Sequence, residues 1–150
     1  MACAENLPHV AGCTGATSER VVQGLYELPD HAMLDMGDFA GGLMKYLRRN
    51  PVARLTIGGG IGKMTKLAQG ARDLHSARSQ VDFTALAQVL DQPGLAKANT
   101  ALEAYALAGP DMAQWVAHSA LANCHSILQS ADIKVDCVVI DRTGRILAQA

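Results

Sequence analysis

A glycine-rich run between a short apolar segment and a helical pattern constrains this chain more than any other feature. Segment 55–57 favours a β-strand, and segment 58–62, Gly-Gly-Gly-Ile-Gly, follows it directly. From Lys63 onward, apolar residues recur at helical spacing as far as Leu74. A strand that enters a glycine turn and then a helix is typical of sites for anions and cofactors, because backbone N–H groups are accessible and the helix dipole favours negative charge. We therefore expect a ligand-binding turn at 58–62.

The glycine run fits neither of two common phosphate-binding fingerprints. A P-loop requires glycine where Ile57 stands and serine or threonine where Met64 stands. The dinucleotide pattern, read from Gly58, reaches Lys63 where its last glycine is required. The alternative therefore stays open that this is a tight strand-to-helix turn that only needs small residues.

Length, composition and charge favour a single globular domain over a nucleic-acid-binding or membrane-spanning protein. The chain has 150 residues, the size of one domain, with 49% hydrophobic residues, 18% charged residues and a net charge of −1. It lacks the basic balance of nucleic-acid-binding proteins, and no apolar run is long enough to span a membrane. We expect a cytoplasmic protein, because the first residues lack the pattern of a signal peptide. The apolar excess suits a chain whose surface is partly covered by another domain or subunit.

The cysteines give no sign of a metal site. None of the four shows the spacing of metal ligands, and their positions are Cys3, Cys13, Cys124 and Cys137. His118 precedes His125 by seven residues, whereas helical ligand pairs usually lie three or four apart. We expect neither a bound metal nor a disulfide, because a reducing compartment keeps thiols free.

Apolar runs and helical patterns alternate along the chain, which predicts a single α/β domain over residues 1–150. The sheet is expected to be mostly parallel with crossover helices, and its strands are expected at about 32–36, 54–58 and 135–140. A helical insertion between the later strands is expected at 83–90, 99–107 and 111–128. Asn99 or Thr100 is a suitable cap for the second of these helices, and Asp111 for the third.

Polar residues follow the expected strands. Open parallel sheets bind ligands at the carboxyl ends of their strands, and Asp35, Asp38 and the turn at 58–62 fall at such ends. A hydroxyl-rich loop at 12–19 precedes another expected helix, so it offers a second set of free N–H groups.

Four phrases of the sequence together closely resemble the C-terminal half of the CbiD family, the cobalt-precorrin-5B C(1)-methyltransferases. They occur in the same order and at similar spacing, at 12–19, 34–42, 55–76 and 141–144. The family implies transfer of a methyl group from S-adenosylmethionine to carbon 1 of a corrin-ring intermediate in cobalamin biosynthesis. Family members carry a sizeable region before Gly12, whereas Met1 stands only eleven residues ahead of it here. We therefore expect a C-terminal part that works with the missing N-terminal region or as a homo-oligomer.

The resemblance implies a site for the cofactor. The adenosine and methionine parts of S-adenosylmethionine suit a glycine turn, and acidic residues at a neighbouring strand end suit the ribose hydroxyls. The cofactor-binding residues that we expect are Asp35, Asp38, Gly58, Gly59, Gly60 and Gly62. For each aspartate the alternative stays open that its carboxylate caps or solvates a turn.

The resemblance also implies a basic site for the substrate, because a precorrin carries many carboxylate side arms. Lys63 and Lys66 are expected near a helix N-terminus, where a cation is unfavourable unless an anionic ligand compensates. The substrate-binding residues that we expect are Thr14, Thr17, Ser18, Lys63, Lys66 and His75. The alternative to a substrate site is that these basic residues form an ordinary helix face exposed to solvent.

Methyl transfer from a sulfonium ion is an in-line displacement, so the protein mainly holds donor and acceptor in register. We therefore expect no activated nucleophile, and no catalytic residue is assigned. Two further readings stay open: a cofactor- or tetrapyrrole-binding module without catalysis, and a structural domain whose glycine turn is only a turn.

Overall fold

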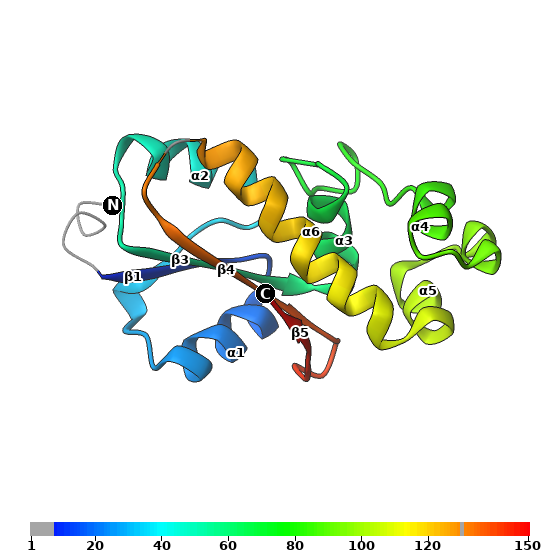
Figure 1. Ribbon diagram of the computed structural model, residues 1–150. Helices are drawn as coiled ribbons and strands as arrows, with labels where there is room; N and C mark the ends of the chain where they lie inside the picture. Colours follow the sequence, from blue (N-terminus) through cyan, green and yellow to red (C-terminus); the bar gives the residue numbers. More distant parts are fainter. Residues whose placement is uncertain (1–7, 130) are drawn as a thin grey trace.

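The computed structural model describes residues 8–129 and 131–150 (Figure 1). Within them lies a five-stranded sheet with the strand order β2-β1-β3-β4-β5. The strands are β1 (His9–Cys13), β2 (Met33–Leu34), β3 (Arg54–Gly60), β4 (Lys134–Ile140) and β5 (Ile146–Gln149). The α-helices are α1 (Ala16–Tyr26), α2 (Ala40–Arg49), α3 (Ile61–Ala68), α4 (Phe83–Val89), α5 (Ala101–Ala108) and α6 (Pro110–Leu128). Two short 3₁₀ helices are η2 (Asp30–Ala32) and η3 (Pro93–Lys97).

The sheet is mostly parallel, as the sequence predicted. The pairs β1–β2, β1–β3 and β3–β4 are parallel, and β5 pairs antiparallel with β4 at one edge. The three expected strands therefore share one sheet, although 32–36 is reduced to Met33–Leu34. The strand β1, which lies between β2 and β3, is not among the strands expected from the sequence. Because the chain passes from β1 to β2 on one side and returns to β3 on the other, the strand order reverses at the β1–β3 junction.

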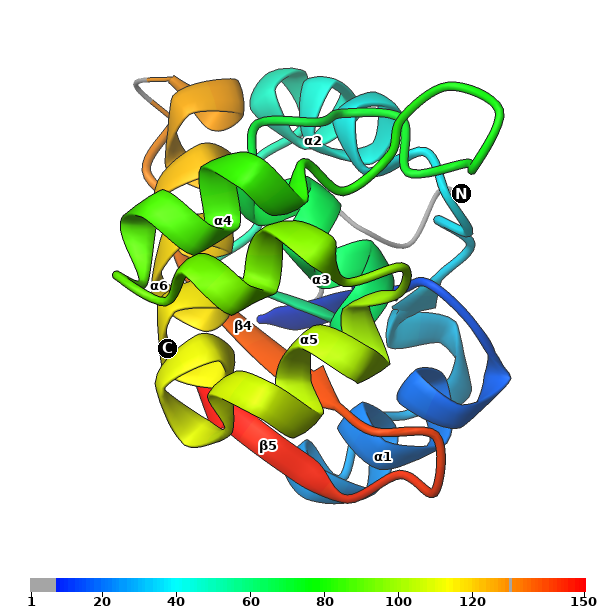
Figure 2. The ribbon, with the colours of Figure 1, turned by 90° about the vertical axis from the view of Figure 1, so that its right-hand side faces the viewer.

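Helices cover both faces of the sheet. Figure 1 shows α1 below the sheet, and α2 and α6 above it. The helix α3 packs against α6 and α5 on the upper side. Figures 1 and 2 place α4 and α5 at the end of the molecule toward which β3 and β4 run. The carboxyl ends of these strands therefore lie beside the helical insertion.

Side chains of β3 alternate between the two faces of the sheet. Leu55 and Ile57 belong to the large core cluster under α2, α3 and α6. The opposite face of β3 meets α1 so closely at Gly58 that a Cβ added there would lie 2.6 Å from Val22 Cγ2. Glycine at this position therefore lets α1 pack directly on the strand.

The predicted turn at 58–62 is wrong, because three of its glycines continue the strand. Gly58, Gly59 and Gly60 lie opposite consecutive residues of β4, and α3 begins at Ile61. In a sheet interior the ladder satisfies backbone N–H and C=O groups that a buried turn would leave without partners. The strand therefore carries the glycines up to the carboxyl edge, and Gly62 lies in the first turn of the helix.

The helix after the glycines is shorter than predicted. It ends at Ala68, not near Leu74, and Gly70 has φ +99°, a backbone conformation that favours glycine. Lys66 therefore lies in the last turn of α3, so the expectation that it opposes the dipole at the N-terminus is wrong.

The three helices of the insertion are confirmed to within two residues. Thr100 is the cap of α5, because its hydroxyl accepts a 3.1 Å hydrogen bond from the Glu103 N–H. The predicted cap of α6, Asp111, lies instead in the first turn, after Gly109 at the cap and Pro110 at the first position. Proline is favoured there because the N–H group that it lacks would have no partner within the helix at this position.

A polar cluster around Asp136 ties β3, β4 and the end of α1 together, away from the carboxyl edge. The Asp136 carboxylate accepts hydrogen bonds from Arg54 Nη2 at 2.9 Å, from Thr56 Oγ1 at 2.7 Å and from the Tyr26 hydroxyl. Burial raises the pKa of Asp136, but the hydrogen bonds from Arg54, Tyr26 and Thr56 together hold it below its ordinary value. The charged form of this carboxylate therefore stabilises the fold.

We expect Asp136→Asn to lower the free energy of unfolding at pH 7 by about 2 kcal/mol, since three donors lose a charged acceptor. A depressed pKa adds stability above the unfolded-state value of about 4, and that stability is lost as pH falls through the native-state value. The parent should therefore lose more stability than the variant below about pH 5. Urea unfolding at several pH values measures this difference, and parallel acid profiles would contradict it.

Candidate functional site

A cavity of about 530 Å³ lies at the carboxyl ends of β1, β3 and β4. Thr14 follows β1, Gly60 ends β3, and Ile140 ends β4, and all three line the cavity. The cavity thus sits at the junction where the strand order reverses, which is where open α/β sheets bind ligands. Its lining residues are Thr14, Gly15, Ala16, Thr17, Ser18, Gly60, Ile61, Gly62, Lys63, Thr100, Ala101, Leu102, Ile140, Asp141 and Arg142.

Three helices begin at this cavity. The first residues of α1, α3 and α5, namely Ala16, Ile61 and Ala101, all line it. The first N–H groups of a helix have no acceptor within the helix, and its N-terminus carries a partial positive charge. The convergence of three such ends makes the electrostatic potential of the cavity favourable for an anionic group.

The start of α1 is locked by its own serine. Ser18 Oγ donates to the Gly15 carbonyl at 3.0 Å and accepts from the Gly15 N–H at 3.2 Å, and only 3% of Ser18 is exposed. Thr14 N–H donates to the Gly58 carbonyl at 3.1 Å. Ser18 therefore shapes the loop at the cavity, whereas Thr14 and Thr17 are partly exposed there.

The predicted cofactor glycines divide into two pairs. Gly60 and Gly62 line the cavity, whereas Gly58 and Gly59 are buried in the strand behind it. A Cβ on Gly59 would lie 2.8 Å from both Thr14 Oγ1 and Thr14 Cγ2, whereas a Cβ on Gly60 would meet nothing within 4 Å. Gly59 therefore allows close packing of the loop after β1, Gly58 allows close packing of α1, and Gly60 keeps the cavity open.

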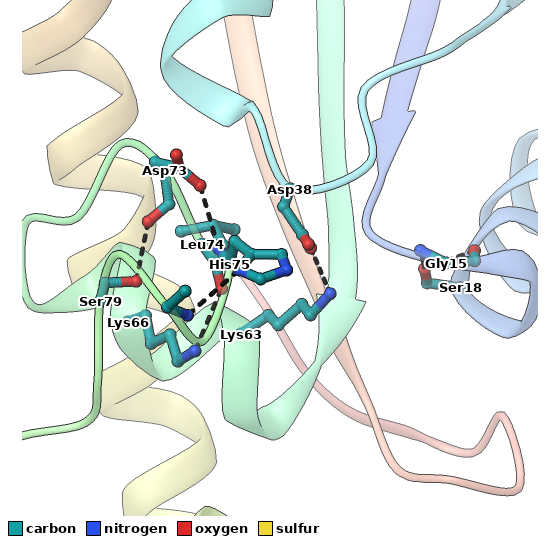
Figure 3. Close-up of polar contacts among 10 residues, drawn as sticks. Gly15, Ser18, Asp38, Lys63, Lys66, Asp73, Leu74, His75 and Ser79 are labelled. Carbon is teal, nitrogen blue, oxygen red and sulfur yellow. Dashed lines mark hydrogen bonds and ion pairs between the residues drawn. The ribbon is translucent and has the colours of Figure 1, made fainter.

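The lysines of α3 have different partners (Figure 3). Lys63 lines the cavity and forms an ion pair with Asp38, which follows β2. The Lys66 ammonium instead donates to the Leu74 carbonyl at 3.0 Å. Asp38 therefore neutralises Lys63, while Lys66 fixes the loop that follows α3.

His75 also belongs to that loop rather than to the cavity. Its N–H donates to Asp73 Oδ1 at 3.1 Å, and its ring Nδ1 accepts from the Ala77 N–H at 3.1 Å. Neither His75 nor Lys66 lines the cavity. The prediction that both line one pocket with Lys63 is wrong, because the chain leaves the helix at Ala68 and the loop that follows packs against Asp38, whose carbonyl accepts a 2.8 Å hydrogen bond from the Leu74 N–H.

A smaller cavity, of about 330 Å³, lies on the other side of the β1–α1 loop from the first, which is the larger cavity of these two. It shares Thr14, Gly15 and Ala16 with the first cavity, and its acidic lining residues are Glu19 and Asp35. Asp35 follows β2 and is exposed. The loop thus separates an acidic compartment from one whose charged lining residues are Lys63, Asp141 and Arg142.

Several residues that line the larger cavity are not among the site residues expected from the sequence. Thr100 and Leu102 come from the start of α5, and Asp141 and Arg142 come from the β4–β5 turn. The phrase 141–144 was singled out for the family resemblance but not for the site. Its place directly after a predicted strand was the signal that could have assigned it, since carboxyl ends of parallel strands meet at one edge.

The described residues contain no group of three or more histidine, cysteine, aspartate or glutamate side chains that could hold a metal ion. Cys13, Cys124 and Cys137 are free and buried, and Cys3 lies outside the described residues. Burial raises the pKa of Cys13 to about 12, so its thiol stays protonated at neutral pH. No helix in the described ranges is long and apolar enough to cross a membrane.

Fold and site together define an open-sheet α/β protein with a cavity at the carboxyl edge of its sheet, at the point where the strand order reverses, which is the place where proteins of this class bind ligands. Residues 73–150 match the family described as "CbiD, C-terminal domain". The chain belongs to the CbiD family, which confirms the resemblance found in the sequence.

Relatives of known name agree with this assignment. The chain is 50% identical over 152 residues to proteins named cobalt-precorrin-5B C(1)-methyltransferase from Brucella anthropi, Brucella ovis and Brucella canis. Each match covers 94% of this chain and 41% of the relative, so the chain spans less than half the length of these relatives. A comparison with solved structures gave no match.

Proposed function

We propose that this chain takes part in the transfer of a methyl group from S-adenosylmethionine to carbon 1 of cobalt-precorrin-5B. The observation that carries the proposal is the cavity at the β1–β3 junction. It occurs in a chain that is 50% identical to a protein named cobalt-precorrin-5B C(1)-methyltransferase. The regions of the relatives beyond this match are proposed to complete the site, either within one polypeptide or across an oligomer.

The donor set at the carboxyl edge fits the methyl donor. The acidic compartment with Asp35 suits ribose hydroxyls, because an exposed carboxylate accepts two hydrogen bonds from a diol. The helix N-termini at the larger cavity suit the carboxylate of the methionine part. Both compartments share the loop 14–16, so one ligand can lie across it.

S-adenosylmethionine supplies a methyl group on a positively charged sulfur, so the chemistry requires no nucleophile from the protein. The role of the chain's residues is to hold donor and acceptor in line. We assign Asp35, Gly60 and Gly62 to contacts with the cofactor, and Thr14, Thr17 and Lys63 to contacts with the substrate. We propose that four further residues hold these contact residues in place through packing and hydrogen bonds, namely Gly58, Gly59, Ser18 and Asp38. Lys66 and His75 order the loop that follows α3.

Calorimetry with S-adenosylmethionine tests the proposal on the chain itself. We expect the parent to bind it and Asp35→Asn to bind about tenfold more weakly, since charged hydrogen bonds contribute about 1.5–3 kcal/mol. Asp91→Asn is the matched control, because Asp91 is exposed and lies between α4 and η3. Failure of the parent to bind S-adenosylmethionine would overturn the proposal and favour a structural domain.

A methylation assay separates an enzyme from a binding module. Cobalt-precorrin-5B incubated with this chain and methyl-labelled S-adenosylmethionine should gain label if the chain alone holds a complete site. Binding of the cofactor without label transfer would show that the chain is a binding module that needs the rest of the relatives' sequence for catalysis.

A further inference from the structure

The β4–β5 turn is a rigid element at the larger cavity. A single carboxylate oxygen, Asp141 Oδ1, accepts hydrogen bonds from Thr143 N–H at 2.8 Å, Thr143 Oγ1 at 2.7 Å and Arg145 N–H at 3.0 Å. The hydrogen bond from Thr143, with smaller contributions from the backbone N–H groups, holds the pKa of Asp141 below its ordinary value. The charged carboxylate therefore fixes the path of the turn.

The same turn is held against the N-terminal part of α1. Gly144 has φ +90°, and a Cβ added to it would lie 3.1 Å from Val21 Cγ2 and 3.5 Å from Thr17 Cγ2. Only glycine combines this backbone conformation with so close an approach. The turn and the start of α1 thus form one wall of the cavity.

The charged side chains that line the cavity differ in whether they have an ion-pair or hydrogen-bond partner within the protein. Among the residues that the structure describes, the charged side chains lining it are Lys63, Asp141 and Arg142. Lys63 is paired with Asp38, and Asp141 is occupied by its own turn. No hydrogen bond or ion pair of the Arg142 guanidinium occurs within the described part of the chain. Arg142 is therefore the cation at this cavity whose charge is available to a ligand.

We propose that Arg142 binds a carboxylate side arm of the substrate at the mouth of the larger cavity; this rests on the proposed function. A guanidinium presents paired N–H donors that match a carboxylate, and three helix N-termini add positive potential in the same cavity. Because Arg142 is exposed as well as lining the cavity, a ring too large to enter can still place one arm against it. Asp141 and Gly144 act as positioning residues that hold Arg142 there.

Two soluble corrinoids test this proposal on the full chain. Cobyrinic acid carries free carboxylate arms, and cobinamide has the same ring with its arms amidated. We expect Arg142→Gln to bind cobyrinic acid about tenfold more weakly than the parent, with the difference shrinking at high salt, and Arg142→Lys to retain part of the affinity. Affinity for cobinamide should change less than twofold.

Arg145→Gln is the matched control. It removes an exposed arginine of the same turn that does not line the cavity, so its affinity for cobyrinic acid should equal that of the parent. Equal affinity of Arg142→Gln and the parent, or an equal loss for both corrinoids, would overturn the proposal. A parent that binds S-adenosylmethionine but not cobyrinic acid would also overturn it and leave the proposed function standing, whereas a parent that binds neither would overturn both.

Discussion

Replacing Gly60 by leucine is expected to abolish binding of S-adenosylmethionine while the fold is kept. Gly60 lines the larger cavity, its backbone is extended at φ −66° and ψ 160°, and a Cβ added there meets no atom within 4 Å. A leucine side chain therefore projects into the cavity without a clash inside the protein. Its volume displaces the ligand, and we expect an affinity loss of at least about 100-fold, which is about 2.7 kcal/mol.

The measurement is calorimetric binding together with thermal unfolding of the same samples. Gly60 is also the N-cap of α3, where leucine is less favourable than glycine, so the free energy of unfolding should fall by no more than about 1 kcal/mol. Gly24→Leu is the control with the same change of residue, because Gly24 is exposed in α1 and has open space around it. Affinity of Gly60→Leu within twofold of the parent would place the cofactor elsewhere.

The sequence predicted the sheet where strands are rich in β-branched and apolar residues and failed where glycine is frequent. Val135 to Ile140 has an unambiguous strand pattern, whereas β1 contains only Val10 as a β-branched residue. Glycines at 58–60 were assigned to a turn, because glycine usually marks one. Only the tertiary contacts of Val22 and Thr14 explain why Gly58 and Gly59 are needed inside a strand.

The part of the site that lies at the carboxyl ends of the strands was predictable from the sequence. The loop 14–18, Gly60, Gly62 and Lys63 line one cavity, and the edge of a parallel sheet was the reason to expect them together. Lys66 and His75 were grouped with Lys63 by sequence proximity, which does not determine where the chain goes after α3 ends. The availability of Arg142 depends on a three-dimensional inventory of charge partners, which no sequence pattern provides.

Gly58→Ala is expected to lower the free energy of unfolding by about 3 kcal/mol, because an inserted methyl group has no space in a well-packed interior. The added Cβ would lie 2.6 Å from Val22 Cγ2 and 3.3 Å from Cys13 Sγ, both of which are buried. The clash pushes α1 away from β3, and α1 begins at the cavity. Binding of S-adenosylmethionine should therefore weaken together with stability.

A double-mutant cycle with Val22→Ala identifies the clash as the cause. Val22→Ala alone should cost about 2 kcal/mol by leaving a cavity, but in the double variant the alanine at 58 occupies the space that the Val22 methyl group vacates. The double variant should then be more stable than the sum of the two single changes by about 2 kcal/mol. Urea unfolding of the four proteins measures this coupling, and Gly24→Ala, which meets no atom within 4 Å, should show no loss of stability. Additive costs within about 0.5 kcal/mol would mean that contact with Val22 is not what requires glycine at this point of β3.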